Sequence, residues 1–148
     1  MPEPTTAYRP SPTEWVRRQV ERIEETGDTR SVHIQDRPVV LLTMRGAKSG
    51  AIRKVPLMRV EHEGVYAAVA SQGGRPTHPQ WYHNLLAEPH IELQDGTDTF
   101  PVTARLLEGE EYERWWQRCV AAFPPYADYL EKAGAAGRRI PLFLLERD

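Results

Sequence analysis

Cysteine is nearly absent from this 148-residue sequence, in which Cys119 is the only one. A lone cysteine cannot form an internal disulfide, and the five histidines show neither an HExxH pattern nor acidic partners at metal-binding spacing. The sequence therefore predicts no metal site. The cysteine usage favours a reducing, cytoplasmic environment.

Long hydrophobic runs are also lacking. No stretch approaches the roughly 18 apolar residues of a transmembrane helix, and the first dozen residues hold four prolines but no apolar segment of signal-peptide length. We therefore expect a protein that is neither secreted nor membrane-spanning, in which residues 1–12 are disordered or extended.

Neither sign of charge dominates. Nineteen Lys and Arg residues stand against 21 Asp and Glu residues, and the formal net charge of -2 argues against nucleic acid as the main partner. An anion would have to be bound by a local cluster of cations. The length and the 40% hydrophobic content are typical of a single globular domain, here residues 1–148.

Several catalytic motifs are missing. There is no GxSxG turn, no P-loop and no GxGxxG turn, so hydrolase and Rossmann-type dinucleotide functions lose their main support. Cys119 lies among Trp116, Val120 and Phe123 in a predicted helix, which indicates a small core residue.

The apolar periodicity predicts an α+β fold. Ser11 as N-cap, Pro12 as first helical residue and Glu14 indicate a helix that ends near Thr26, with Trp15, Val16, Val20 and Ile23 on one side. Further helices are expected after a Thr77 cap, over residues 108–123, and for a turn or two over residues 126–132. Short β-branched runs predict strands at residues 39–44, 52–60, 65–70, 91–94, 100–107 and 140–145.

Three glycine-containing turns separate these strands, at residues 46–50, 61–64 and 94–97. Turns of this length favour antiparallel neighbours. The sequence therefore predicts a meander of strands that curls into a barrel.

The turn at residues 46–50 and the strand after it carry the densest cluster of cations. Lys48 and Ser49 supply donors, while Arg53 alternates with Val55 and Leu57 onto one face of the strand. Such a turn suits a phosphate or a carboxylate. A basic surface hairpin without any ligand explains the same residues equally well.

Three other segments could line a binding site. The loop of Ala70, Ser71, Gln72, Gly73 and Gly74 can bring backbone close to a flat ligand, although an ordinary turn explains it as well. Trp81 and Asn84 share a helix face with Leu85, and for Trp81 alone core packing is the stronger interpretation. Tyr126 and Tyr129 put two phenols on one helix face, able to orient an acceptor or simply to pack.

These segments occur in an order that resembles the deazaflavin-dependent nitroreductase family of actinobacteria, which includes F420H2-dependent quinone reductases. The resemblance covers the chain from about Arg37 to its end. It rests on residues 40–43 with 46–50, Arg53 and Pro56-Leu57, on residues 70–74 and 79–85, and on residues 126–129 before Arg139-Ile140-Pro141.

The resemblance implies a split β-barrel, similar to FMN-binding split barrels, and binding of the 5-deazaflavin coenzyme F420. It places Lys48, Ser49 and Arg53 at the coenzyme's phosphate and tail carboxylates. Around the ring it places Ala70, Ser71, Trp81 and Asn84, with Gln72 and Gly73 in the same loop and Pro56 and Leu57 on the adjacent wall. It implies hydride transfer to an organic acceptor, for which a quinone is the expected class, and Ser71, Tyr126 and Tyr129 are the candidate catalytic residues.

Three positions depart from the family pattern: Ala47 replaces a usual arginine, Gln72 a common lysine, and Phe123 a further tyrosine of the best-known nitroreductase. Arg45, Lys48, Lys54 and Arg75 are near enough in the sequence to compensate for the lost cations. The loss of a phenol at Phe123 predicts weak or absent activity on bicyclic nitroimidazoles.

Two other functions remain open. The cationic turn could grip the phosphate of FMN instead of F420, and a protein that lacks one phenol could carry F420 without efficient turnover. The first helix leaves room for peripheral membrane contact, which its interspersed glutamates make weaker than for a basic helix.

Overall fold

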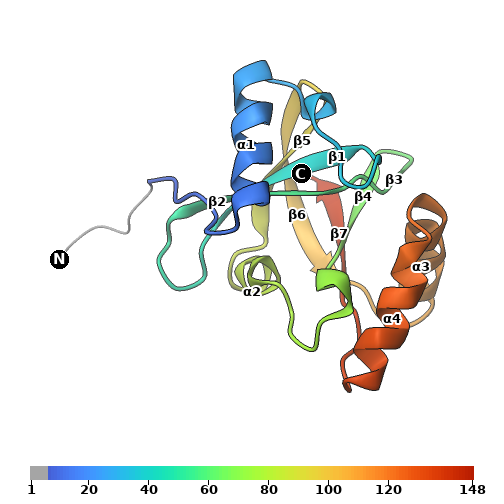
Figure 1. The fold of residues 1–148 in the computed structure, drawn as a ribbon. Helices are drawn as coiled ribbons and strands as arrows, with labels where there is room; N and C mark the ends of the chain where they lie inside the picture. Colours follow the sequence, from blue (N-terminus) through green and yellow to red (C-terminus); the bar gives the residue numbers. More distant parts are fainter. Residues whose placement is uncertain (1–6) are drawn as a thin grey trace.

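A computed structural model of the chain describes residues 7–148. Seven antiparallel strands form one curled sheet in the order β2-β1-β5-β6-β7-β4-β3 (Figure 1). The strands are β1 (Val39–Arg45), β2 (Ile52–Met58), β3 (Glu61–His62), β4 (Val65–Val69), β5 (His90–Asp95), β6 (Asp98–Leu106) and β7 (Leu142–Arg147). The α-helices are α1 (Glu14–Thr26), α2 (Gln80–Ala87), α3 (Gly109–Ala122) and α4 (Pro125–Ala135), with short 3-10 turns η1 (Thr29–Ser31) and η2 (Gln72–Gly74). This arrangement is the predicted split-barrel, α+β fold.

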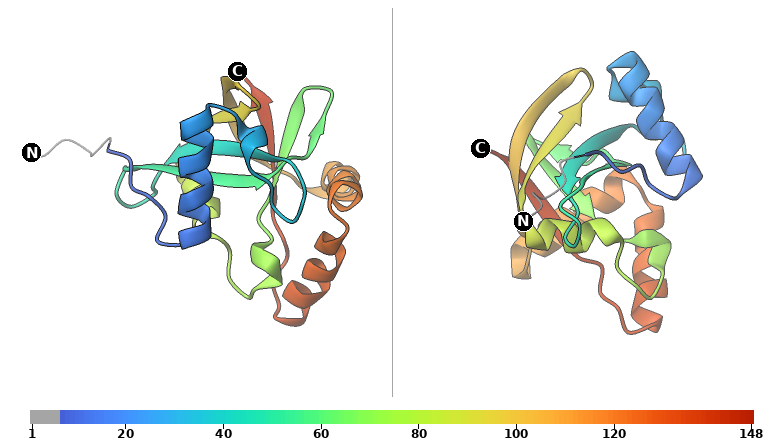
Figure 2. Two further views of the ribbon diagram at one scale, coloured as in Figure 1. Left: turned by 45° about the horizontal axis from the view of Figure 1, so that its top comes forward. Right: turned by 90° about the vertical axis from the view of Figure 1, so that its left-hand side faces the viewer.

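The most apolar strands are buried on both faces, because helices cover the outside of the curled sheet. In β1, Val40 and Leu42 pack inside the barrel, whereas Leu41 packs with Ile23 of α1. In the same way, β4 and β7 alternate between the barrel interior and a second cluster built with α3 and α4. The left view of Figure 2 places α1 and the α3–α4 pair on either side of the strands. The long apolar runs in the sequence follow from this double burial.

All six predicted strands are present, and the turns at residues 46–50 and 94–97 join antiparallel neighbours as predicted. The simple meander is wrong. Glu63 and Gly64, both with positive φ, form a two-residue turn between β4 and the short extra strand β3, so β2 and β4 are not paired. Strand β4 pairs instead with β7 from the end of the chain, for example Ala68 opposite Phe143.

Helix ends differ from the predicted ones. Helix α1 begins at Glu14 with Thr13 as its N-cap, and the Ser11 hydroxyl oxygen accepts a hydrogen bond from the Thr13 N–H instead of capping the helix. Pro79, not Thr77, precedes α2, and the Thr77 hydroxyl oxygen accepts a hydrogen bond from the Gln72 side chain. Helix α4 runs for 11 residues, longer than the one or two turns expected.

Helix α1 is amphipathic, but its buried side is narrower than predicted. Val20 and Ile23 are buried, whereas Trp15 is 54% exposed near the helix start. Residues 7–10 run beside β2, where the Ile52 N–H donates to the Ala7 carbonyl and the Arg9 N–H to the Ile52 carbonyl. Across residues 7–148, no helix has both the length and the apolar character that crossing a membrane requires.

Candidate functional site

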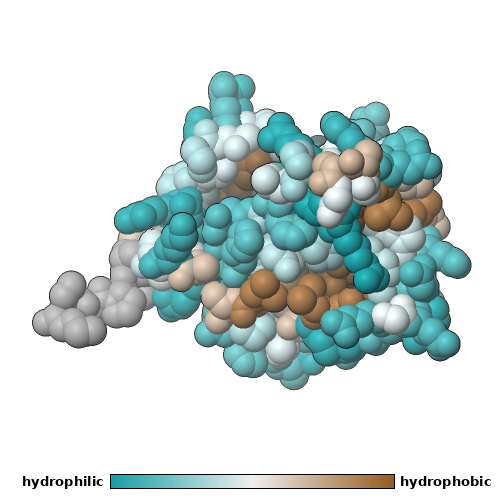
Figure 3. Space-filling view, turned by 90° about the horizontal axis from the view of Figure 1, so that it is seen from below, coloured by the Kyte–Doolittle hydropathy of each residue, from teal (hydrophilic) through white to brown (hydrophobic). Residues whose placement is uncertain are grey.

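A cavity of about 650 Å³ lies between β2, an edge strand of the sheet, and the end of β4. Strand β2 forms one wall of the cavity. The remaining walls come from four other parts of the chain: the start of α1, the loop that follows β4, helix α2 and helix α4. The lining includes ten of the predicted site residues: Arg53, Pro56, Leu57, Ser71, Gln72, Gly73, Trp81, Asn84, Tyr126 and Tyr129. Lys48, Ser49 and Ala70 are outside the lining. Figure 3 shows an apolar patch framed by hydrophilic side chains on the face seen from below.

The charged residues that line this cavity all carry the same sign. They are Arg9, Arg53, Lys54 and Arg75, and no Asp or Glu belongs to the described lining. The Arg53 Nη1 donates to the carbonyl oxygens of Arg9 (3.2 Å) and Pro10 (3.3 Å), and among residues 7–148 Arg53 has no carboxylate partner. Lys54 has a carboxylate partner outside the lining, with its Nζ 2.6 Å from Glu24 Oε1. The charge of the described lining therefore suits an anionic ligand.

The turn between β1 and β2 lies next to this cationic wall. It is tight at Gly46, where a Cβ would lie 2.8 Å from the Ser49 Oγ. Ser49 stabilises the turn, since its Oγ accepts a hydrogen bond from the Ala51 N–H at 3.1 Å, and Lys48 is exposed. Contacts of Lys48 and Ser49 with a ligand stay predictions.

Asn84 connects this turn to α2. Its side chain is buried, and its Oδ1 accepts a hydrogen bond from the Ala47 N–H at 2.9 Å and a weaker one from the Gln80 Nε2 at 3.3 Å. Asn84 is therefore committed to positioning the turn, while its predicted contact with a ring remains a prediction.

The loop after β4 has an unusual backbone. Three consecutive residues adopt positive φ, namely Gln72 (47°), Gly73 (64°) and Gly74 (79°), and only two of them are glycines. Ser71 precedes them in the αR region and lines the cavity. Ala70 is fully buried behind the loop, with its N–H donating to the Pro141 carbonyl.

Aromatic residues form another part of the lining. Trp81 packs against Phe143 with tilted rings whose centroids are 6.1 Å apart, and the Tyr126 and Tyr129 rings meet edge to face at 6.2 Å. Burial raises the pKa of Tyr126, so this phenol stays protonated at neutral pH. Within residues 7–148 its hydroxyl has no hydrogen-bond partner, whereas the Tyr129 hydroxyl accepts a long one of 3.5 Å from Gln35.

Some lining residues escaped the sequence analysis. Trp15 looked like a core residue because it has the helical spacing of Val20 and Ile23, but it lies at the cavity. Gln35 and Arg9 come from irregular segments with no periodic signal. The buried Arg138, whose guanidinium holds the loop after β4, was also missed, because nothing local distinguishes it from the exposed Arg139.

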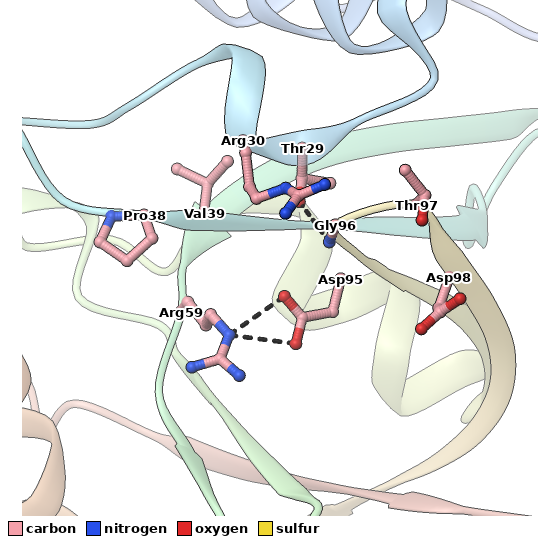
Figure 4. A pocket seen from close by; sticks show the side chains of 9 residues that line it. All are labelled: Thr29, Arg30, Pro38, Val39, Arg59, Asp95, Gly96, Thr97 and Asp98. Atoms are coloured by element: carbon pink, nitrogen blue, oxygen red, sulfur yellow. Dashed lines mark hydrogen bonds and ion pairs between the residues drawn. The ribbon is translucent and has the colours of Figure 1, made fainter.

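A second cavity of about 440 Å³ lies beside the turn between β5 and β6 and contains none of the predicted residues (Figure 4). Its walls carry charges of both signs. The Arg59 Nε lies 3.0 Å from both carboxylate oxygens of Asp95, and the Tyr66 hydroxyl donates to the same carboxylate at 2.5 Å. Burial and this hydrogen bond raise the pKa of Tyr66 to about 12.

Comparisons with known proteins find related sequences and structures. A Mycobacterium tuberculosis protein provisionally named as an F420H(2)-dependent quinone reductase is 36% identical over 108 residues, which are 73% of this chain and 88% of that protein. A solved structure described as an F420-H2 dependent reductase is 56% identical, with a TM-score of 0.68, and the match covers 78% of this chain and 99% of that one.

More distant structures share the fold alone. A Clostridium acetobutylicum protein of the pyridoxinephosphate oxidase family matches with a TM-score of 0.51 at 16% identity, over 87% of this chain and 84% of that one.

The sequence model of one family, described as F420H(2)-dependent quinone reductase, matches residues 15–147, nearly the whole chain. The protein thus belongs to the F420H(2)-dependent quinone reductase family.

Proposed function

We propose that the large cavity binds coenzyme F420 and that the protein passes hydride from F420H2 to a quinone. One observation carries the proposal: every charged residue in the described lining of the cavity is a cation, and the same lining holds apolar and aromatic side chains. The residues fit the coenzyme, which joins a flat ring to an anionic phosphodiester and glutamate tail. When bound, the 5-deazaflavin supplies a two-electron hydride donor.

The cationic wall holds the anionic part of the coenzyme. Arg53, already oriented by two backbone carbonyls, is the main contact of the phosphate, with Arg75 as a second cation of the lining, and charge-assisted hydrogen bonds give both affinity and register. Lys48 and Ser49 reach the tail where it leaves the cavity.

The middle of the cavity holds the ring. Pro56, Leu57 and Trp81 supply apolar contact on the walls, and the loop with Ser71, Gln72 and Gly73 supplies polar contacts at the ring edge. The Ser71 hydroxyl has no hydrogen-bond partner within residues 7–148, so it is free for this role.

The phenols of Tyr126 and Tyr129 face the acceptor. Tyr126 holds a proton on its phenol oxygen and is able to donate a hydrogen bond to a quinone oxygen as negative charge develops there. Tyr129, Trp15 and Phe123 also line the cavity. With phenylalanine instead of tyrosine at Phe123, turnover of bicyclic nitroimidazoles is expected to be weak, and robust turnover would contradict this.

The test is oxidation of F420H2 by purified protein with menadione as the acceptor. We expect coenzyme oxidation that depends on both protein and quinone. Tight F420 binding without oxidation across a quinone panel would instead identify a carrier protein. A preference for FMN over F420 in the same preparation would reject the assigned coenzyme.

A further inference from the structure

Arg138 is a buried cation with no carboxylate partner in the described part of the chain. It is 7% exposed, and burial lowers its pKa. Its Nε donates to the Arg75 carbonyl at 2.8 Å, its Nη1 to the Ala70 carbonyl at 2.9 Å, and its Nη2 to the Ser71 carbonyl. Burying an unpaired charge is costly, so these carbonyls must replace the lost hydration. The Nη1 also lies 2.8 Å from the His78 Nδ1.

These contacts bracket the part of the loop whose backbone is least favourable. Between the Ala70 and Arg75 carbonyls lie Gln72, Gly73 and Gly74, all with positive φ. Such a backbone persists only where surrounding groups impose it. Arg138 is the side chain placed to do so, because it holds carbonyls at both ends of the segment.

The same loop rests on α4 at Gly74. A Cβ at that position would lie 2.8 Å from the Tyr129 carbonyl oxygen and 3.0 Å from the Lys132 Cβ, closer than packed atoms allow. The loop backbone therefore contacts the helix that carries Tyr129.

Arg138 is itself attached to the end of α4. Gly137 has a positive φ of 79°, which turns the chain at the end of the helix. The Gly137 N–H donates to the Gly134 carbonyl at 3.0 Å, and the Arg138 N–H donates to the Ala133 carbonyl at 2.8 Å. This is a Schellman motif, which fixes the direction of the chain as it leaves the helix. Helix α4, Arg138 and the loop thus each contact the other two.

We propose that Arg138 is a positioning residue, which holds the loop containing Ser71, Gln72 and Gly73 in fixed register with the phenols of Tyr126 and Tyr129. The inference rests on the proposed function, in which the loop contacts the coenzyme and the phenols face the acceptor. Arg138 itself contacts neither ligand, and it acts through the backbone carbonyls that it binds.

The first experiment compares R138M and R138K with the wild type, without coenzyme. Amide hydrogen exchange at Gly74 and Arg75 reports on the loop, because these N–H groups donate to the Ser71 and Gln72 carbonyls. We expect exchange in R138M to accelerate at least about tenfold relative to amides of β5, and R138K to be intermediate. Equal acceleration in the loop and in β5 would mean a purely global effect and would overturn the proposal.

The second experiment measures the dissociation constant of F420 for the same proteins, at a temperature where all are folded. We expect R138M to weaken binding roughly tenfold or more, since misplaced binding groups lose most of their contribution. Y112F is the matched control: it removes a buried 2.6 Å hydrogen bond to the Ile140 carbonyl near Arg138 but leaves the loop untouched. It should lower the melting temperature without changing F420 affinity.

Should R138M fail to fold, R138K and G74A test the positioning role in its place. G74A pushes the loop away from α4 without touching Arg138, and should shift both readouts in the same direction. A wild type that does not bind F420 would refute the proposed function, while hydrogen exchange would still decide the role of Arg138. Wild-type affinity and wild-type loop exchange in the variants would refute the positioning role alone.

Discussion

The two cavities differ in what neutralises their cations. In the larger one, Arg53 is held by two backbone carbonyls, and no described lining residue is a carboxylate. In the smaller one, Arg59 lies against both oxygens of Asp95, which also accepts a hydrogen bond from Tyr66. A backbone carbonyl orients a guanidinium without cancelling its charge, whereas a carboxylate cancels it.

The difference separates a binding surface from a structural ion pair. An arginine that keeps its charge at a cavity attracts an anionic ligand, and its loss should reduce binding more than stability. An arginine paired inside a hydrogen-bonded network contributes to folding instead. Size alone does not distinguish the two cavities, because both could admit a small molecule.

Replacing Arg53 with methionine should give the largest effect on binding. Loss of a charge-assisted hydrogen bond costs about 2 kcal/mol, which corresponds to a roughly 30-fold higher dissociation constant for F420. Calorimetric or fluorescence titration measures it. Arg22→Met is the control, since Arg22 is exposed on α1 in a 3.6 Å ion pair. Equal affinity of Arg53→Met and wild type for F420 would contradict the role of the larger cavity as an anion-binding site.

Asp95→Asn should lower stability and leave F420 binding nearly unchanged. It weakens the contacts of Arg59 and Tyr66 with the carboxylate, and because the Arg59 side chain is 36% exposed we expect a loss of only about 1 to 2 kcal/mol in the free energy of unfolding. Urea denaturation measures this loss, and F420 affinity should stay within about twofold. Weakened F420 binding with unchanged stability would assign the smaller cavity to the ligand.

Tyr126→Phe should slow quinone reduction roughly tenfold while F420 affinity is retained, because the phenol donates to the acceptor and not to the coenzyme. Its stability should hardly change, since the hydroxyl has no partner within residues 7–148. Steady-state kinetics with menadione measures the rate. An unchanged rate would remove Tyr126 from the acceptor site and leave it a packing role.

The smallest effect concerns pH. Burial, with Arg138 and His83 nearby, lowers the pKa of His78 below its usual value of 6.5. The folded state therefore binds this proton less tightly than the unfolded state, and stability is lost as pH falls from about 6.5 through the folded-state pKa. In His78→Asn the unfolding free energy should depend less on pH over this interval. Parallel curves for the two proteins would contradict the assignment.

Local patterns in the sequence predict the elements well but not their partners. Runs such as residues 39–44 predict strands because β-branched side chains cover both faces of a buried sheet. The pairing of β4 with β7 joins residues more than 70 positions apart, for example Ala68 with Phe143. No local turn encodes that contact, so the predicted meander failed at this point.

The candidate site shows the same division. Arg53 and Leu57 were predicted because strand alternation places them on one face, and the cavity contains both. Lys48 was predicted because many cations lie close to it in the sequence, yet its place in the turn puts it outside the lining of the cavity. Arg138 was missed because its partners, the carbonyls of Ala70, Ser71 and Arg75, are more than 60 residues away.

The most direct test of the account is a titration of the purified protein with F420 and, separately, with FMN, following quenching of tryptophan fluorescence. Trp81 lines the cavity, so Trp81→Phe should lose much of the signal at unchanged stoichiometry. We predict F420 binding at micromolar affinity or tighter and weaker binding of FMN. Preference for FMN, or no binding of F420, would contradict the assignment of the cationic cavity to the deazaflavin coenzyme.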